Sequence, residues 1–387
     1  MPAEAEAAVV RRARLRDGES QNRTWTANYF RSPTRAVRRS HISPARNVAY
    51  TDVVPVPPHI GEIKIISDSV LRLLVCPRDH SPLQIQDALL KCAQGHTFAI
   101  EQGVPVFAEC PRREPIPLNM PPLRQTEKSS AAAQAHTTAI DPFVNDWIVN
   151  TNGNLYWRMR GRLPRYPIPA WPFGEGRGRV LLDIGCGWGR WSIAAARAGF
   201  QPIGLDLHID TLAAAARVSR QLNVHGEFLC SGIEELPLAS RSVDCVFSYS
   251  VLQHIEKSIV LRSFDEIARV LKPDGTCIIQ LPNKVGVVSI AQQLRRGFRN
   301  ARPGSFEMRY WSHDEIRRAL EAAGLRGVRI RADGFFSQNP QLADLDLLSM
   351  PGKALVLASY AGRTIANALP ILTHMADSLW IKARAPE

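Results

Sequence analysis

The sequence predicts an α/β fold in which helices connect the strands of a parallel sheet, preceded by a small β-rich module. Two observations lead to this prediction. From about residue 140 onward, short apolar runs alternate with amphipathic helical patterns, as strand–helix–strand units do. Between residues 63 and 110, two turns that contain cysteine and histidine flank short apolar segments. With 387 residues, the chain can form one large domain and a smaller one.

Composition divides the chain into four segments. Residues 1–60 form a basic arm with no helical or strand period, which is predicted to be disordered. Its first 50 residues contain ten arginines and four acidic residues, in a chain of net charge +12. This excess favours attraction to nucleic acid or an anionic surface, with a solvated tail as the alternative. A compact module (63–110), a proline-rich linker (111–139) and the α/β domain (140–387) follow.

In the α/β domain, apolar runs and helical patterns predict each element in turn. Strands are expected at 179–184, 201–206, 226–230, 243–249 and 275–281, with helices near 188–198, 209–222 and 256–271. A Pro-Asp-Gly turn at 273–275 leads into the fifth strand. A helix at 312–323, a strand at 326–333 and a last strand at 378–384 complete the domain.

The first strand ends in a glycine-rich turn that indicates a ligand site. Asp183 closes the apolar run, and Gly185, Gly187 and Gly189 follow it. Glycine allows positive φ and a close approach of the backbone to a ligand. A dinucleotide-binding turn places its third glycine three residues after the second, whereas here the gap is two, so NAD is not expected. Asp206 ends the next strand, where a carboxylate can accept both ribose hydroxyls, or can cap the helix that follows.

The Asp-x-Gly-x-Gly-x-Gly turn resembles motif I of the class I S-adenosylmethionine (SAM) methyltransferases. Residues 243–254 and 267–275 are similar to the branch of that superfamily that methylates small molecules, including quinone rings. The resemblance is strong over residues 178–282. It implies a Rossmann-like seven-stranded sheet whose last strand is antiparallel and inserted beside its predecessor.

The resemblance also implies the residues that bind SAM. Asp183, Gly185 and Gly187 would hold the methionine end, and Asp206 the ribose. Many relatives place Gly-Asp-Ala where this chain has Ser-Gly-Ile, so adenine recognition is expected to depend on the Ile233 N–H or on another side chain. The full expected set is Asp183, Gly185, Cys186, Gly187, Asp206, Gly232, Ile233 and Ser248.

His254, just past the fourth strand, is the candidate catalytic base. In proteins of the resembling family, the residue at this position faces the substrate. A base is needed if the acceptor is a hydroxyl or an acidic carbon. The alternative is a packed or capping histidine at the start of the next helix. Tyr249, Tyr310 and Trp311 are aromatic candidates for the wall of the acceptor pocket, or for the core.

The small module contains two knuckle-like turns that suit a zinc ion. Tetrahedral zinc needs four ligands, and turns of this length bring two together each. Cys76, His80, Cys92 and His96 are the expected ligands, with Asp79 as the alternative to His80. The module resembles zinc ribbons that precede some bacterial methyltransferases, including ribosomal RNA guanine methyltransferases. Relatives have a second cysteine where this chain has Asp79, so a metal-free module is the alternative.

Two further segments are predicted to border the acceptor site. Residues 141–166 are expected to cap the SAM site, or to pack as a solvated helix on the sheet edge. The insertion after the fifth strand predicts a basic amphipathic helix, since it contains apolar residues at helical spacing and no acidic residue between 283 and 305. Such a helix could bind an anionic membrane surface or a phosphate-bearing substrate, or cover the sheet edge. Its residues are Val287, Ile290, Leu294 and Phe298 on the apolar face, with Lys284, Arg295, Arg296, Arg299 and Arg302 around it.

The predicted function is methyl transfer from SAM to a small-molecule or glycolipid-like acceptor. The zinc-ribbon-like module and the basic arm favour an RNA methyltransferase as the first alternative. A non-catalytic SAM-binding partner of another protein is the second. Seven cysteines, some within apolar strands, and no secretory signal favour the cytoplasm. The best candidate for a membrane span, 354–372, is interrupted by Arg363 and Pro370.

Overall fold

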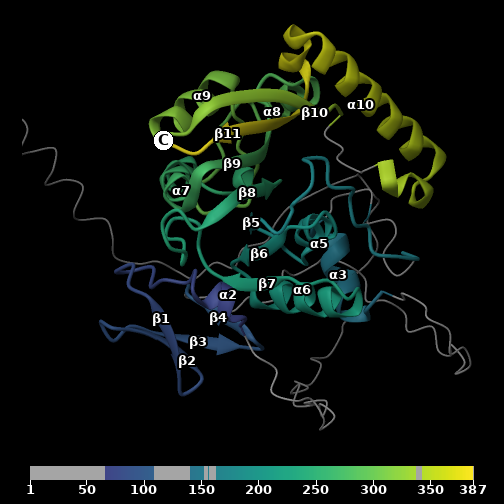
Figure 1. Ribbon diagram of the computed structural model, residues 1–387. Helices are drawn as coiled ribbons and strands as arrows, with labels where there is room; N and C mark the ends of the chain where they lie inside the picture. The colour runs from purple at the N-terminus through teal and green to yellow at the C-terminus, as the bar shows by residue number, and fades with distance from the viewer. Residues whose placement is uncertain (1–65, 109–139, 152–155, 157–162, 337–341, 387) are drawn as a thin grey trace, which may run out of the picture. The chain divides into compact units, whose positions relative to one another are not determined.

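The computed structural model describes residues 66–108, 140–151, 156, 163–336 and 342–386 (Figure 1). The described residues all belong to one compact unit, residues 62–387. The predicted arm (1–60) and linker (111–139) therefore lie outside the described residues.

Seven strands of the α/β domain form a continuous sheet. Its order is β7 (Glu227–Cys230), β6 (Gln201–Asp206), β5 (Val180–Ile184), β8 (Val243–Tyr249), β9 (Leu271–Pro282), β11 (Ser378–Arg384) and β10 (Arg326–Gly334). β7 to β9 are parallel, and β11 runs antiparallel between β9 and β10. The strand order, with the last strand inserted beside its predecessor, confirms the predicted Rossmann-like fold.

Helices cover the central strands, which explains the apolar sequence of these strands. Leu181, Leu182 and Ile184 of β5 are completely buried, as expected where a parallel sheet has both faces covered. A capping box between Ser312 and Glu315 starts the helix before β10. The connecting helices are α5 (Arg190–Arg197), α6 (Ile209–Gln221), α7 (Lys257–Val270) and α9 (His313–Ala322).

The predicted turn at 273–275 lies inside the bounds of β9, where pairing with β8 is interrupted. The strand begins at Leu271, and its register with β8 shifts between Val243 and Cys245. Asp274 has φ +64°, in the left-handed region. The Pro-Asp-Gly segment is thus an irregularity within a long strand, and it does not separate the strand from the preceding helix.

The small module extends the large sheet rather than standing apart from it. Val106 pairs in parallel with Cys230 of β7, and the Phe107 N–H donates to the Cys230 carbonyl at 2.8 Å. Leu74 forms a further bridge with Leu238. Apolar residues of the module belong to the same buried cluster as residues of β5 to β9. The module consists of α2 (Asp68–Leu71), β1 (Leu83–Gln86), β2 (Leu89–Cys92), β3 (Thr97–Glu101) and β4 (Val104–Val106).

A helix in the expected cap segment packs beside the glycine-rich turn. In α3 (Pro142–Thr151), Val144 and Ile148 are completely buried and share a cluster with Trp188 of that turn. Asp141, just before α3, pairs with Arg217 of α6 at 2.6 Å. Within the predicted cap, residues 152–155 and 157–162 lie outside the described residues.

The remaining helices follow β9 and β10. They are α8 (Val287–Arg295) and α10 (Met350–Ala368), with short 3₁₀ helices η1 (Leu252–His254), η2 (Leu342–Leu347) and η3 (Pro370–Met375). The segment considered as a membrane span is the end of α10, which continues through Arg363, followed by η3, which begins at Pro370. In the part of the chain that the structure describes, no helix is long and apolar enough to cross a membrane.

Candidate active site and metal site

The glycine-rich turn between β5 and α5 is packed on one side and open on the other. Gly185, Gly187 and Gly189 have φ of +72°, +53° and +82°. A Cβ on Gly185 would lie 2.4 Å from a methyl group of Val251, so glycine is required there. A Cβ on Gly187 would have no neighbour within 4 Å. The backbone at Gly187 therefore faces open space that a ligand can approach.

Asp206 lies directly against this turn. One of its carboxylate oxygens accepts the Gly187 N–H at 3.0 Å, and the other accepts the His208 N–H at 3.0 Å. His208, and not Asp206, is the N-cap residue of α6, so the alternative capping role is not seen. A carboxylate can accept about four hydrogen bonds, so Asp206 keeps acceptor capacity beside the open side of the turn.

Asp183 is a second carboxylate at the same place and is buried. It accepts a hydrogen bond from the Ser192 hydroxyl of α5 at 2.6 Å. Burial raises the pKa of Asp183 to about 7, and the negative charge of Asp206 contributes in the same direction. Among the described residues, no lysine or arginine forms an ion pair with Asp183 or Asp206. The turn is thus flanked by two carboxylates without a cationic partner in the described chain.

The predicted adenine segment lies beside Asp206. The Ser231 N–H donates to the Asp206 carbonyl at 3.1 Å, which brings the loop after β7 to the end of β6. The Ile233 side chain is buried in the core, and its N–H has no partner among the described residues. Gly232 lies between them and is partly exposed. The geometry therefore leaves the Ile233 N–H available at this end of the site.

Two residues of the expected SAM set have side chains that are engaged elsewhere. Ser248 is completely buried, and its hydroxyl donates to the Ile184 carbonyl at 3.2 Å. Cys186 is a buried free thiol, and burial raises its pKa well above the usual value. Only the backbones of Cys186 and Ser248 are therefore available to a ligand.

His254, in η1 at the end of β8, is held in one tautomer. Its ring stacks on Phe306 with centroids 3.9 Å apart, and its Nδ1 lies 3.1 Å from the Phe306 carbonyl oxygen. A carbonyl oxygen can only accept, so Nδ1 carries the hydrogen and Nε2 keeps a lone pair. Burial lowers the pKa of His254, which favours the neutral ring. The side chain thus has the form that a general base requires.

The three aromatic candidates lie in different surroundings. Trp311 is buried, and the Tyr310 hydroxyl donates to Gln292 at 2.5 Å. Tyr249 packs against Trp191 and Trp380, with ring centroids 4.9 and 5.3 Å away. Its hydroxyl is buried without a partner among the described residues. Tyr249 and Trp311 thus each have a buried polar atom without a partner among the described residues, since the Trp311 Nε1 is unpaired as well.

A buried polar cluster that the sequence did not indicate joins the cap segment to the glycine-rich turn. Arg190, the first residue of α5, forms an ion pair with Asp344 of η2 at 3.4 Å. The Tyr156 hydroxyl donates to the same carboxylate and lies 3.3 Å from the Arg190 guanidinium. The three residues are far apart in the sequence, and no local spacing marks them as partners.

The small module brings together four potential metal ligands. Cys76, Asp79, Cys92 and His96 offer atoms that all lie within 4.8 Å of one another. His96 Nδ1 lies 3.4 Å from each of the two sulfur atoms and 2.8 Å from an Asp79 oxygen. Ligands in tetrahedral zinc sites are separated by roughly 3.3–3.8 Å, since each lies about 2.0–2.3 Å from the ion. The donor types and the compact arrangement fit zinc.

Asp79, and not His80, completes this cluster. His80 is exposed and has φ +58°, so its side chain lies outside the four. One Asp79 oxygen accepts the backbone and side chain of Ser81, which leaves the other oxygen directed at His96 and Cys92. Asp79, the alternative to His80 in the sequence analysis, is therefore the residue that lies with the other three potential ligands.

Residues 181–275 match the family model described as a methyltransferase domain. A ubiquinone biosynthesis O-methyltransferase of Xanthomonas campestris pv. campestris (strain B100) is 29% identical over 187 residues, covering 43% of this chain and 74% of that protein. A malonyl-(acyl-carrier protein) O-methyltransferase of Methylovorus sp. (strain MP688) is 38% identical over 104 residues, covering 25% of this chain and 34% of that protein. This chain spans only 27% to 44% of the length of three further curated relatives.

Solved structures give matches of low similarity. The Haemonchus contortus phosphoethanolamine N-methyltransferase 2 in complex with S-adenosyl-L-methionine is 19% identical, with a TM-score of 0.41. The match covers 64% of this chain and 61% of that one. A complex between the Haloferax volcanii Trm112 methyltransferase activator and a methyltransferase matches with 20% identity and a TM-score of 0.39, covering 63% of this chain and 94% of that one.

Proposed function

We propose that the protein transfers the SAM methyl group to a small-molecule or glycolipid-like acceptor, and that residues 181–275, which match a methyltransferase domain, form part of its catalytic domain. One observation carries the proposal: Asp206 contacts the open glycine-rich turn, and neither it nor Asp183 has a cationic partner among the described residues. SAM carries an ammonium and a sulfonium group, whose positive charges would complement these carboxylates.

Each part of the chain has a role in this proposal. SAM supplies an electrophilic methyl group when it is bound, so the protein mainly aligns the acceptor and excludes water. The backbone at Gly187 and the carboxylate of Asp206 hold the cofactor, and the Ile233 N–H is available to the adenine ring. His254 takes the proton of a hydroxyl or acidic carbon at Nε2, the nitrogen that its bond to Phe306 leaves free.

The test is methyl transfer from labelled SAM into a fractionated cell extract, with products identified by mass. We expect label in a small-molecule or lipid fraction. His254→Gln should lower turnover by about 100-fold or more and leave SAM affinity nearly unchanged, because a general base acts on the acceptor. His225→Gln is the matched control, since the side chain of His225 is exposed and lies 3.8 Å from Glu227.

Two outcomes would contradict this function. Label that appears only in RNA, and is released by ribonuclease, would assign the enzyme to RNA methylation. SAM binding without transfer into any fraction would identify a SAM-binding partner protein.

We also propose that the four ligands of the small module hold one structural zinc ion. Two thiolates, an imidazole and a carboxylate fill a tetrahedral shell and leave no open position for catalysis. The module shares a buried cluster with β5 to β9, so zinc would stabilise both the module and the adjoining part of the sheet. The four ligands are distant in sequence from the predicted SAM residues.

Elemental analysis of protein purified without chelator tests the zinc site. One zinc per chain is expected in the wild type and in His80→Ala, whereas Cys92→Ser and Asp79→Ala should lose most of it. The unfolding temperature should fall in the same two variants, because metal binding contributes to folding. Zinc retained in Asp79→Ala and lost in His80→Ala would instead assign the fourth ligand to His80, and a metal-free wild type would refute the site.

A further inference from the structure

α10 has an unusual apolar surface. Only one stripe of this 19-residue helix is buried, at Gly352, Val356, Ser359 and Ala366. The rest of the helix is mostly apolar as well, and its large side chains are exposed, including Met350 at 75%. A helix on the surface of a globular protein normally presents polar residues to water. The outer side of α10 therefore lacks a partner among the described residues.

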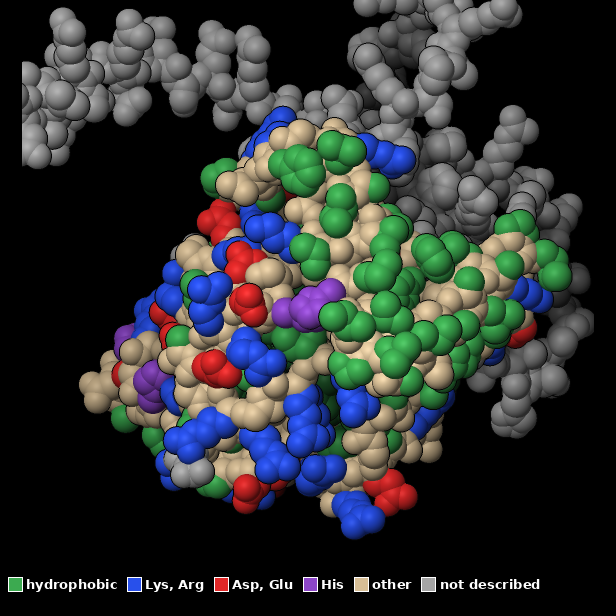
Figure 2. Space-filling view, turned by 90° about the horizontal axis from the view of Figure 1, so that it is seen from above, with side chains coloured by type: hydrophobic (Ala, Val, Ile, Leu, Met, Phe, Trp, Pro, Cys, Tyr) green, Lys and Arg blue, Asp and Glu red, His purple; other side chains and the backbone are tan. Residues whose placement is uncertain are grey.

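α8 and η3 have the same character. Leu294 of α8 is 64% exposed, Phe306 in the following loop 73%, and Ile371 of η3 79%. Hydrophobic side chains gather over one side of the space-filling view, with lysines and arginines around them (Figure 2). Monomeric soluble proteins seldom expose contiguous apolar patches of more than a few hundred Å², and larger ones mark sites of protein or membrane interaction. The exposed residues of α8, the loop to 306, α10 and η3 are called the α8–α10 surface below.

Hydrogen bonds join the two parts of this surface. The Asp377 carboxylate, just after η3, accepts the Val288 and Ser289 N–H groups at the start of α8, at 2.7 and 3.0 Å. The Asn283 amide donates to two carbonyls, those of His374 and Ala376, each at 2.8 Å. α8 is thus fastened to η3, and η3 directly follows α10 in the chain. The exposed apolar residues of α8 and of α10 with η3 therefore meet at η3.

The charge of the surface has a single sign. Neither 283–306 nor 347–376 contains an aspartate or glutamate, and both contain lysine and arginine. The Arg295 guanidinium makes no hydrogen bond or ion pair with the described residues. The seven cations are Lys284, Arg295, Arg296, Arg299, Arg302, Lys353 and Arg363.

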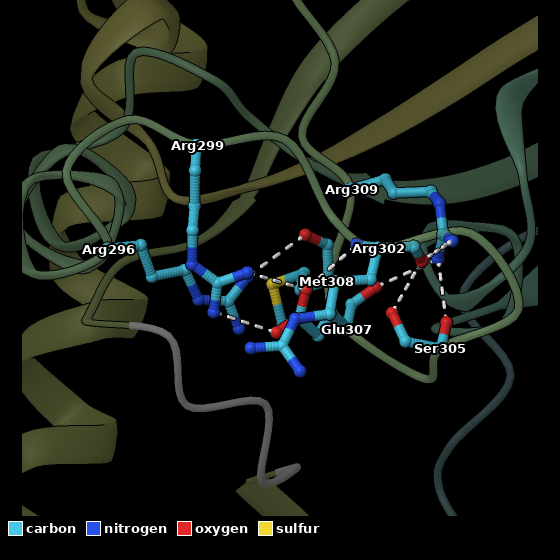
Figure 3. A network of polar contacts seen from close by, with 7 residues as sticks. All are labelled: Arg296, Arg299, Arg302, Ser305, Glu307, Met308 and Arg309. Atoms are coloured by element: carbon cyan, nitrogen blue, oxygen red, sulfur yellow. Dashed lines mark hydrogen bonds and ion pairs between the residues drawn. The ribbon is translucent and has the colours of Figure 1, made fainter. Parts of the chain in front are cut away.

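The loop after α8 contacts some of the arginines around this surface. Arg299 pairs with Glu307 at 3.0 Å, so one acidic residue just beyond the insertion does engage an arginine (Figure 3). The Arg296 and Arg309 guanidiniums also donate to backbone carbonyls of this loop and of His254. The other five of the seven cations, Lys284, Arg295, Arg302, Lys353 and Arg363, have no acidic residue within the two segments.

We propose that the α8–α10 surface docks on an anionic lipid bilayer. Exposed apolar side chains would enter the boundary between headgroups and acyl chains, and the cations would meet lipid phosphates. Charge complementarity favours this occupant over a second copy of the chain. A two-fold contact would place the same cations against one another, with no acid in either segment to offset them.

One part of this inference rests on the proposed function, namely that the methyl acceptor comes from the bilayer. α8 follows the carboxyl end of β9, the edge of the sheet at which ligands of open α/β sheets bind. A bilayer under α8 would therefore lie beside the acceptor site, and the acceptor would be a lipid or a lipid-soluble molecule taken from the bilayer.

Co-sedimentation of the full-length protein with vesicles tests the proposal. Vesicles that contain phosphatidylserine should bind the protein at least ten-fold more tightly than phosphatidylcholine alone, and salt should weaken that binding. Replacing Arg295, Arg296 and Arg299 by glutamine should lower affinity by about 100-fold, since each basic residue near the surface contributes several-fold. Leu357→Ser with Ile365→Ser should also weaken binding, because both side chains are exposed on α10.

A matched charge control is Arg197, Arg220 and Arg262 changed together to glutamine. These exposed arginines lie on α5, α6 and α7, outside the surface, so vesicle affinity should change little. Equal loss in both triple variants, or equal binding to both kinds of vesicle, would overturn the proposal. A dimer in sedimentation velocity that the α10 variant disrupts would assign the surface to a second copy instead.

Unfolding temperature and SAM affinity, measured on every variant, verify that each is folded. Vesicle binding needs no SAM, so the two proposals can fail separately. Vesicle binding without SAM binding would refute only the proposed function, whereas methyl transfer without vesicle binding would refute only the docking surface.

Discussion

The glycine-rich turn and the α8–α10 surface differ in both shape and charge. At the turn, the apolar neighbours Trp188 and Ile184 are buried, and the unpaired charges are the carboxylates of Asp183 and Asp206. On the α8–α10 surface, large apolar side chains are exposed and the charges are positive. A small negative region suits a small cation, and a broad positive apolar surface suits an extended anionic partner. The two regions therefore have distinct partners, and each can be altered without the other.

The largest expected effect at the turn is that of Asp206→Ala. Loss of a charged hydrogen-bond partner costs about 1–3 kcal/mol, so SAM affinity should fall by about 5- to 150-fold. Asp210→Ala, on the exposed side of α6 four residues away, is the matched control. Calorimetric titration with SAM measures both. Unchanged affinity in a folded Asp206→Ala protein would remove Asp206 from the site, and a loss of vesicle binding in that variant would show that the two regions are coupled.

A smaller effect concerns the proton on Asp183. Its pKa of about 7 in the folded chain lies above the usual 3.8, so the folded protein holds this proton more tightly than the unfolded chain does. The resulting stabilisation is complete below about pH 4 and is lost as pH rises through 7. A cationic ligand favours the carboxylate, so SAM binding near pH 6.5 should release part of one proton, and affinity should increase as pH rises toward 7.

Calorimetry in two buffers of different ionisation enthalpy measures this proton release. Asp183→Asn should abolish it. Glu227→Gln is the control, because burial also raises the pKa of Glu227, which binds the Ser67 N–H away from the turn. Proton release that persists in Asp183→Asn would locate the titrating group elsewhere.

Local spacing predicts the turn well because all of its determinants lie within a few residues. The apolar strand before Asp183 and the alternating glycines after it specify strand, turn and helix together. The resemblance carried by these residues then implied the order of the strands, including the antiparallel last one. The strand positions followed from apolar runs, because strands covered on both faces have few polar residues.

Features that depend on contacts between distant segments could not be predicted in the same way. Tyr156, Arg190 and Asp344 meet only through the fold, and none of them has a partner at a fixed spacing. Asp79 and His80 are neighbours with equally suitable ligand atoms, and the left-handed backbone at His80 decides between them. α10 contains glycine and proline near its start and lacks a polar face, so the pattern of an amphipathic helix was absent.

Asp377 has a consequence for how the molecule would lie on a surface. Its carboxylate accepts the first amides of α8 and also the Phe336 N–H at the end of β10, at 2.6 Å. A Cβ on Gly286 would lie 2.6 Å from the Asp377 Cα, so the two backbones are in direct contact. α8 is thus braced to the sheet and cannot roll independently of it. A bilayer that holds α8 would therefore fix the tilt of the whole sheet, and with it the direction from which an acceptor reaches the glycine-rich turn.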